Sequence, residues 1–306
     1  MRIIVFGGSG FLGSHVCDKL SDAGHDVVIY DIRNSPWLRS NQKMLTGDIL
    51  DPDAINQAMK GADVVFNFAG IADIGEANNR AVDSVRYNIL GNALILDACV
   101  KEGVKRYIFA SSVYVYSKAG GFYRCSKQAC ELYIENYHRV YGLEYTILRY
   151  GSLYGPRSDE RNAIHRFVRE ATETGKITYY GSPHALREYI HVEDAALSSV
   201  EILKAQFANE HIILTGYQPM RVGDLLKMIA EMLAKPIEFI FEDDQTDVHY
   251  EITPYSFSPN VGKKFFPQVN TDLGQGVLKV IEDQFIKTHS ELHSVNGLFV
   301  EEENKQ

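Results

Sequence analysis

The chain opens with Arg2-Ile3-Ile4-Val5-Phe6-Gly7-Gly8-Ser9-Gly10-Phe11-Leu12-Gly13, the stretch that decides its fold. An apolar run of strand type leads into a glycine-rich turn, and a helical pattern follows as far as Leu20. Glycine lets the backbone turn sharply and approach a ligand closely, and the first N–H groups of the next helix can bind an anion. Strand, glycine turn and helix in this order predict a site for the pyrophosphate of a dinucleotide. Two registers of the turn fit the spacing: Gly7, Gly10 and Gly13, or Gly8, Gly10 and Gly13.

A carboxylate at the end of the second apolar strand indicates which dinucleotide binds. The strand expected at 27–30 ends at Asp31, about twenty residues past the glycines, where a carboxylate binds the hydroxyls of the adenosine ribose. Its charge would repel a 2′-phosphate by roughly 4 kcal/mol per unit charge at about 4 Å. We therefore expect NAD, although Arg33 could offset part of the repulsion and keeps NADP open. Asp48, after another short strand, could contact the adenine or cap a turn, and the sequence supports both.

Strands and helices alternate through the first half of the chain. The pattern predicts strands at 63–68, 107–110 and 145–148 and helices at 80–102 and 123–140. Buried apolar strands separated by helices are typical of a parallel sheet with right-handed crossovers, so we predict a doubly wound α/β (Rossmann) fold. Ligands of such folds lie at the carboxyl ends of the strands, where Asp31, Ala69-Gly70 and Ser112 stand.

The second half is less regular and predicts a smaller α/β region over the sheet. Short strands are expected at 177–180, 212–214 and 237–241, and helices near 161–173, 193–207 and 221–234. We assign a dinucleotide-binding domain to 1–155 with return segments near 187–217, a substrate-binding region to 156–186 and 218–290, and a frayed tail to 291–306.

Composition restricts the class of protein. Lys and Arg total 31 against 40 Asp and Glu, a net charge of −9, and no basic stripe occurs, so a nucleic-acid partner is not expected. No apolar stretch approaches the ~20 residues that a membrane span needs, and no cleavable signal pattern is present. The 4 cysteines show neither metal-ligand spacing nor a disulfide framework, so we expect no metal. We predict a cytoplasmic protein without a membrane partner.

Tyr123 and Lys127 are spaced to meet on one face of the predicted helix 123–140. A free phenol ionises near pH ~10, and a fixed positive charge nearby lowers that pKa and favours the phenolate. The hydroxyl of Ser112 could share the proton or hold a substrate oxygen. The three residues therefore predict a tyrosine base beside the dinucleotide.

Longer motifs surround these residues. They are Asn67-Phe68-Ala69-Gly70, Asn88-Ile89-Leu90-Gly91-Asn92, Ala110-Ser111-Ser112-Val113-Tyr114-Val115-Tyr116, Tyr123-Arg124-Cys125-Ser126-Lys127, Leu148-Arg149-Tyr150-Gly151-Ser152-Leu153-Tyr154-Gly155-Pro156-Arg157 and Arg187-Glu188-Tyr189-Ile190-His191-Val192-Glu193-Asp194. Over roughly residues 1–235 the chain resembles the extended short-chain dehydrogenase/reductases that act on nucleotide sugars. The resemblance implies NAD and favours the glycine register Gly7, Gly10 and Gly13.

The resemblance also implies a role for each site residue. Tyr123 is expected to take the proton of a sugar hydroxyl while NAD takes the hydride, with Ser112 beside it and Lys127 at the nicotinamide ribose. Cofactor contacts are expected from Gly7, Gly10, Phe11, Leu12, Gly13, Asp31, Arg33, Asp48, Ile49, Phe68, Ala69, Gly70, Asn88, Tyr123, Lys127 and Tyr150. Substrate contacts are expected from Ser112, Tyr114, Ser152 and Arg187.

Arg187 stands where the family often binds the nucleotide diphosphate, an anion that suits a planar guanidinium. A salt bridge with Glu188 or Asp194 is the alternative.

Two departures from the family pattern bear on the reaction. The segment between Tyr116 and Tyr123 is shorter than usual, so sugar specificity cannot be transferred from other members. Val113-Tyr114 replaces the Asp-Glu pair of 4,6-dehydratases, which disfavours dehydration, and Tyr114 is expected to be an aromatic wall of the sugar pocket.

We therefore expect a nucleotide-sugar 4-epimerase. The alternatives are a 4-dehydrogenase or reductase that releases the keto sugar and, more remotely, a non-catalytic NAD sensor. Such sensors tend to lack the Tyr–Lys pair. The helices near 80–102 and 123–140 pair two subunits in this family, so a homodimer is expected.

Overall fold

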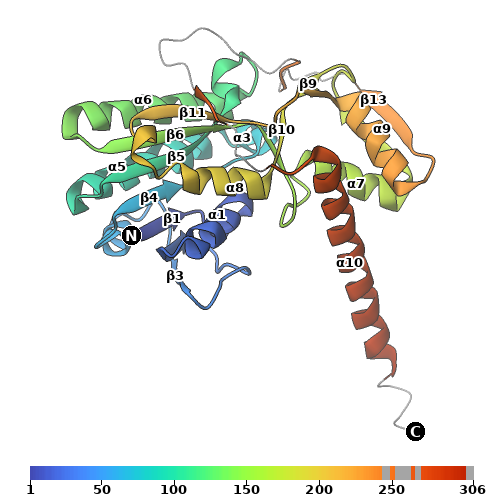
Figure 1. The fold of residues 1–306 in the computed structure, drawn as a ribbon, viewed down its shortest axis with the longest axis horizontal. Coiled ribbons are helices and arrows are strands. Elements are labelled where there is room, and N and C mark those ends of the chain that lie inside the picture. Colours follow the sequence, from blue (N-terminus) through green and yellow to red (C-terminus); the bar gives the residue numbers. More distant parts are fainter. Residues whose placement is uncertain (243–248, 252–262, 266–269, 301–306) are drawn as a thin grey trace.

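The computed structural model describes the backbone of residues 1–242, 249–251, 263–265 and 270–300, and their side chains as far as Ile286. In this part of the chain, one sheet has the strand order β3–β2–β1–β4–β5–β6–β11–β14, and every neighbouring pair is parallel (Figure 1). Its strands are β1 (Arg2–Phe6), β2 (Asp26–Asp31), β3 (Gln42–Thr46), β4 (Val64–Asn67), β5 (Arg106–Ser112), β6 (Glu144–Tyr150), β11 (Glu210–Leu214) and β14 (Lys263–Lys264). The strand order reverses at β1, which confirms the predicted doubly wound fold.

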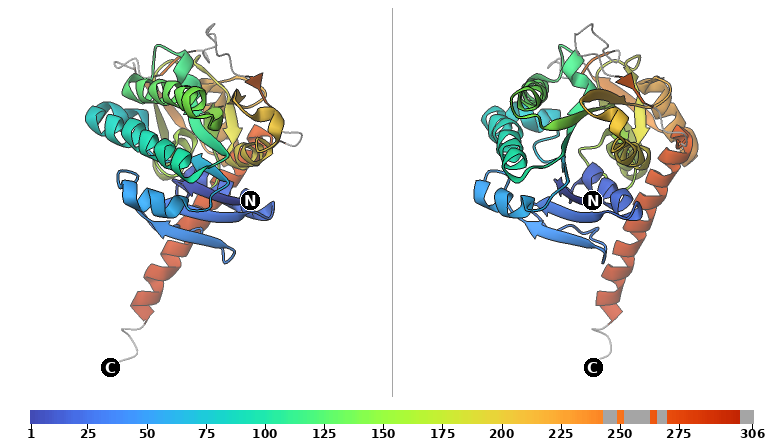
Figure 2. Two further views of the ribbon diagram at one scale, coloured as in Figure 1. Left: turned by 90° about the vertical axis from the view of Figure 1, so that its left-hand side faces the viewer. Right: turned by 60° about the vertical axis from the view of Figure 1, so that its left-hand side comes forward.

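Helices cover both faces of this sheet (Figure 2). Helices α1 (Phe11–Asp22) and α8 (Val192–Glu201) lie on one face, and α2 (Pro52–Met59), α5 (Gly91–Glu102) and α6 (Gly121–Tyr141) lie on the other. Side chains of β1 alternate between the two apolar layers, with Ile3 and Val5 in one and Ile4 and Phe6 in the other. Burial on both faces explains why β1 is apolar without interruption from Ile3 to Phe6.

The crossover between β4 and β5 differs from the single helix expected at 80–102. It contains α3 (Ile74–Asn79), α4 (Ala81–Asp83), a π-helix (Ser84–Leu90) and then α5. The thiol of Cys130 donates to the carbonyl of Asn88 at 3.1 Å, and the side chain of Asn88 bonds the backbone of Ile71. The π-helix therefore contains an asparagine that hydrogen-bonds to neighbouring segments. Helical propensity alone does not predict such a feature.

The second half of the chain contains a smaller region that is built from short two-stranded ladders. They pair β7 (Ser152–Tyr154) with β10 (Tyr189–His191), β8 (Lys176–Tyr180) with β13 (Glu238–Glu242), and β9 (Leu186–Arg187) with β12 (Met220–Arg221). Helices α7 (Ala163–Thr174), α9 (Val222–Leu233) and α10 (Leu273–Val300) enclose a third apolar cluster there. Two 3₁₀ turns, η2 (Val113–Tyr116) and η3 (Ala205–Phe207), complete the described elements.

Helix α10 leaves the body of the molecule. Val277 and Val280 are buried in the third apolar cluster, and the helix then runs outward (Figures 1 and 2). The tail expected at 291–306 is helical to Val300, and 301–306 lie outside the described residues. No helix among the described residues is both long enough and apolar enough to cross a membrane.

Candidate active site

The glycine turn between β1 and α1 leaves no room for side chains. Gly7 has a φ of +76°, and a Cβ on it would lie 2.6 Å from the amide nitrogen of Ala69. A Cβ on Gly13 would lie 2.2 Å from the carbonyl oxygen of Gly7. No side chain caps the first turn of α1, whose N-cap is Gly10. These features support the register Gly7, Gly10 and Gly13, and the turn with its uncapped helix end fits a pyrophosphate.

Asp31 is held over this turn at the carboxyl end of β2. One carboxylate oxygen accepts a hydrogen bond of 3.0 Å from the backbone N–H of Ser9, and the other accepts one of 3.2 Å from Arg33. The Ser9 hydroxyl donates to the carbonyl of Arg33 at 2.9 Å. The carboxylate therefore stands beside the phosphate turn, where the ribose of a bound dinucleotide would lie.

Asp48 takes the turn role, one of the two that the sequence left open. Its Oδ1 accepts from the N–H of Leu50 at 2.9 Å, and its carbonyl accepts from the hydroxyl of Tyr30 at 2.9 Å. The neighbouring Ile49 packs close to α5, since a Cβ on Gly91 would lie 2.8 Å from its Cδ1. Contacts of Asp48 and Ile49 with the adenine stay predictions.

Asn88 positions two segments of the site. Its amide exchanges hydrogen bonds of 2.7 and 3.0 Å with the backbone of Ile71 and donates to the hydroxyl of Ser126 at 2.9 Å. The Ser126 hydroxyl in turn donates to the carbonyl of Tyr123 at 2.8 Å. The loop after β4, which contains Gly70, is thereby fixed relative to α6. A direct cofactor contact of Asn88 stays a prediction.

The structure brings together Ser112, Tyr123 and Lys127. Ser112 ends β5 and its hydroxyl hydrogen-bonds to Tyr123 at the start of α6. The ammonium of Lys127 lies 5.7 Å from the centre of the Tyr123 ring and 4.7 Å from that of Phe109. It donates to the carbonyl of Ala110 at 2.7 Å. A hydroxyl, a phenol and an ammonium thus meet at the edge of the sheet that carries the glycine turn.

The pKa of Tyr123 differs from the sequence expectation. Burial of the phenol raises its pKa to about 12, and the hydrogen bond with Ser112 offsets only part of that rise. Burial also lowers the pKa of Lys127. The expectation that Lys127 brings the Tyr123 pKa below its ordinary value is therefore wrong, because loss of hydration around the phenol dominates.

A buried ion pair behind these residues was not predicted. Glu131 on α6 and Arg149 on β6 are 6% and 4% exposed, and their charged atoms lie 2.5 Å apart. Glu131 also accepts a hydrogen bond of 2.5 Å from Ser111, while Arg149 donates to the hydroxyl of Tyr116 and stacks 4.7 Å from its ring centre. The network joins β5, β6, α6 and η2. One signal was present in the sequence: Glu131 follows Lys127 by four residues and shares its helix face.

Arg187 ends β9, in the region of short two-stranded ladders. It is buried, its guanidinium stacks 4.6 Å from the ring centre of Tyr250, and it donates to the hydroxyl of Tyr179 at 3.3 Å. These residues line a hollow of about 530 Å³, together with His249 and Glu251.

Neither salt bridge considered for Arg187 is present among the described residues. Glu188 pairs with Lys264 at 2.7 Å. Asp194 accepts hydrogen bonds of 2.6 and 3.1 Å from the backbone and side chain of Thr271. Among the described residues, the two carboxylates considered for Arg187 are therefore paired with other groups.

Three further residues that were expected to contact cofactor or substrate interact with other parts of the protein. The hydroxyl of Tyr150 pairs with that of Ser199 at 2.6 Å. The backbone N–H of Ser152 donates to the backbone carbonyl of Glu188 at 3.0 Å. Phe68 stacks on Phe66 with ring centres 6.0 Å apart. Their contacts with cofactor or substrate stay predictions.

A match to a family of known proteins accords with this geometry. The model of the NAD dependent epimerase/dehydratase family matches residues 3–215. The chain belongs to this family. It is thus an enzyme of the NAD-dependent nucleotide-sugar epimerase/dehydratase family, and the residues around the glycine turn suit that cofactor.

Relatives in this family differ in their reactions. The chain is 28% identical to a protein of Methanocaldococcus jannaschii to which UDP-glucose 4-epimerase activity is ascribed, over 91% of this chain and 97% of that protein. It is 29% identical to UDP-N-acetyl-alpha-D-glucosaminuronate decarboxylase of Bacillus cytotoxicus, over 76% and 80%. The crystal structure of UDP-glucose 4-epimerase from Thermotoga maritima with UDP-glucose superposes with a TM-score of 0.82 at 26% identity, covering 94% of this chain and 99% of that one.

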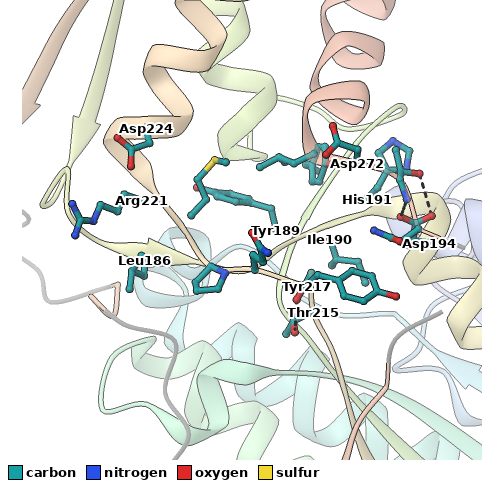
Figure 3. A pocket seen from close by; sticks show the side chains of 18 residues that line it. Leu186, Tyr189, Ile190, His191, Asp194, Thr215, Tyr217, Arg221, Asp224 and Asp272 are labelled. Carbon is teal, nitrogen blue, oxygen red and sulfur yellow. Dashed lines mark hydrogen bonds between the residues drawn. The ribbon is translucent and has the colours of Figure 1, made fainter. Parts of the chain in front are cut away.

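A second hollow has a volume of about 580 Å³. It has Arg221 and Asp224 at one end and His191, Asp194 and Asp272 at the other (Figure 3). Neither Tyr123 nor the glycine turn lines it. The size of a hollow alone therefore does not identify the site.

Proposed function

We propose that the protein is an NAD-dependent nucleotide-sugar 4-epimerase. The observation that carries the proposal is the meeting of Ser112, Tyr123 and Lys127 at the sheet edge that bears the glycine turn. A phenol in that position can exchange a proton with an alcohol while a hydride crosses to or from a dinucleotide in the same crevice. NAD rather than NADP is supported by the carboxylate of Asp31 beside the turn.

Tyr123, Ser112 and Lys127 would each have a separate role in the reaction. Tyr123 takes the O–H proton of the carbinol at C4, and Ser112 holds the same oxygen through its hydroxyl. NAD, when bound, supplies the acceptor for the hydride that leaves C4. Because burial raises the Tyr123 pKa to about 12, the phenolate is costly to form. The ammonium of Lys127, 5.7 Å from the ring centre, would stabilise the phenolate as it forms.

Inversion at C4 requires the hydride to return to the opposite face of the resulting ketone. Val113 and Tyr114 follow Ser112, so neither of the next two residues is a carboxylic acid that could expel a hydroxyl group. That supports epimerisation over dehydration. Release of the keto sugar would instead make the enzyme a 4-dehydrogenase or reductase.

Arg187 is the residue best placed for the nucleotide diphosphate. Its guanidinium is buried, lines the 530 Å³ hollow and has no carboxylate partner among the described residues. A planar guanidinium can form two parallel hydrogen bonds to phosphate oxygens.

A homodimer would suit the exposed surface of α6. Four of its apolar residues are between 49% and 64% exposed: Leu132, Tyr133, Val140 and Tyr141. Pairing this face with α5 and α6 of a second copy would cover it. Light scattering at micromolar concentration tests the assembly, and a monomer would contradict it.

The experiment for the proposed function has two parts. Mass spectrometry of the purified protein after denaturation is expected to detect NAD. Proton NMR of UDP-, dTDP-, GDP- and CDP-sugars incubated with the protein is then expected to show one sugar with inverted C4 configuration. Accumulation of NADH with a keto sugar would support the dehydrogenase instead, and turnover of simple alcohols alone would exclude both.

A further inference from the structure

Tyr114 has a partner far along the chain. Its hydroxyl lies 2.7 Å from Nδ1 of His249, a residue 135 positions later. The Tyr114 ring also contacts Tyr250 with ring centres 4.7 Å apart, and it meets the ring of Tyr123 edge to face at 6.4 Å. The hydroxyl of Tyr114 is thus fixed by an imidazole next to the catalytic phenol.

Two residues of the segment 249–251 contact strand β9. Arg187 stacks on the buried ring of Tyr250, and the N–H of Leu186 donates to the carbonyl of Glu251 at 2.6 Å. His249 therefore reaches Tyr114 from a segment that is tied to the ladder carrying Arg187.

Arg187, Tyr250, Tyr114 and Tyr123 form a continuous series of contacts. Under the proposed function, one end of the series binds the diphosphate and the other end binds the reacting carbinol. The sugar ring joins these two groups covalently, so it must lie along Tyr250 and Tyr114. The hydroxyl of Tyr114 is then a polar group that lines the position of the sugar.

We propose that Tyr114 selects the sugar by a hydrogen bond to one of its hydroxyl groups, and that His249 is a positioning residue that orients the Tyr114 hydroxyl. This inference rests on the proposed function. A phenol has one proton and two acceptor lone pairs. When its proton points to Nδ1 of His249, its lone pairs face the sugar and accept a hydrogen bond. Burial raises the Tyr114 pKa, so the phenol keeps this proton at neutral pH.

A Tyr114–His249 hydrogen-bonding pair and a plain aromatic wall predict different effects of substitution on sugar binding. A wall needs only the ring, so Tyr114→Phe would leave sugar binding unchanged. A hydrogen-bonding pair needs both the hydroxyl and the imidazole, so either loss weakens the sugar contact while the nucleotide contact at Arg187 is kept. Losses at two groups that act as a unit are not additive.

The test is calorimetric binding to the full chain with NAD present. The ligands are the nucleotide sugar identified by NMR and its nucleoside diphosphate, for example UDP-glucose and UDP. The dissociation constant of the nucleoside diphosphate divided by that of the nucleotide sugar measures the contribution of the sugar to binding. Tyr114→Phe and His249→Leu are each expected to reduce that ratio about fivefold to tenfold.

Two further variants separate positioning from folding. His249→Asn keeps a hydrogen-bonding group near the place of Nδ1 and should restore the ratio to within about twofold. His249→Leu added to Tyr114→Phe should cause no further loss. The control His184→Asn changes an exposed histidine that does not line the hollow and should leave the ratio unaltered.

The failures are distinguishable. If no nucleotide sugar binds or turns over, the proposed function is wrong and this inference falls with it. If the wild-type protein turns over a sugar but Tyr114→Phe keeps the full ratio, only the inference is wrong. Additive losses in the double variant, or no rescue by His249→Asn, would likewise overturn the role of His249.

Discussion

The cofactor half and the substrate half of the molecule build their sites in different ways. Gly7, Asp31 and Ser112 stand at or just beyond the ends of parallel strands, so backbone register alone brings them to one edge. On the substrate side, Arg187 meets Tyr250 and Tyr114 meets His249 only through side chains. The comparison teaches that the sheet positions the residues at its strand ends, whereas the contacts of Arg187 and Tyr114 can change without altering the fold.

The largest expected effect tests the chemistry of the sheet edge. Tyr123→Phe removes the hydroxyl that exchanges the proton, so kcat is expected to fall by about 10²–10⁴-fold while NAD binding is retained. In the wild-type protein, the raised pKa of Tyr123 predicts that kcat/KM rises with pH through the neutral range and up to about pH 10, because the base form becomes more abundant. NMR turnover assays at several pH values measure both effects. Tyr87→Phe removes the hydroxyl of a half-buried tyrosine in the π-helix and is the control. A fully active Tyr123→Phe would show that the base is wrongly assigned.

Gly13→Ala tests whether the glycine turn is as confined as the structure indicates. The added Cβ would lie 2.2 Å from the carbonyl oxygen of Gly7, so the turn must shift, and we expect about 1–3 kcal/mol of destabilisation with at least about a tenfold loss of NAD affinity. Gly24→Ala is the matched control. Its Cβ would meet nothing within 4 Å, and its φ of +79° should cost about 1 kcal/mol without weakening NAD binding. Equal NAD affinities in the two variants would contradict this account of the turn.

The buried pair Glu131–Arg149 tests whether geometry at this edge also depends on side chains. Removing one partner leaves an unpaired buried charge and should cost about 3–5 kcal/mol, whereas Glu131→Leu with Arg149→Met should be near neutral in stability. We expect the double variant to lose about tenfold in kcat, because Ser111 and Tyr116 lose the groups that hold them. Urea unfolding and turnover assays check the two parts. An active double variant would mean that the backbone alone positions the catalytic residues.

The smallest expected effect concerns the junction between the two halves. His191 ends β10 and its Nδ1 accepts from the N–H of Glu193 at 3.4 Å, capping α8. Burial lowers the pKa of His191 to about 4, so the folded protein holds it neutral while the unfolded chain protonates near pH ~6.5. The contribution of neutral His191 to the free energy of unfolding is therefore present above pH ~6.5 and is lost as pH falls through about 4. The loss between pH 7 and 5 is about 1–2 kcal/mol.

His191→Asn keeps a capping oxygen and removes the titration. Urea unfolding at pH 7, 6 and 5 should show a smaller acid loss in this variant than in the wild-type protein. Identical losses would place the acid sensitivity elsewhere.

The same contrast explains what could be predicted from the sequence. The sheet, its strand ends and the meeting of Tyr123 with Lys127 follow from local periodicity and spacing, and the structure bears these out. The pKa of Tyr123 did not follow, because hydration of the phenol depends on surrounding segments that spacing does not reveal. The Tyr114–His249 contact joins residues 135 apart through side chains alone, and no local pattern marks it.

The central claim is that C4 of a nucleotide sugar is oxidised by hydride loss, with Tyr123 taking only the hydroxyl proton. The most direct test uses the substrate deuterated at C4 and follows both configuration and label by NMR. The account predicts that the inverted sugar still carries deuterium at C4, because the same hydride returns. Inversion with loss of the deuterium to water would contradict it.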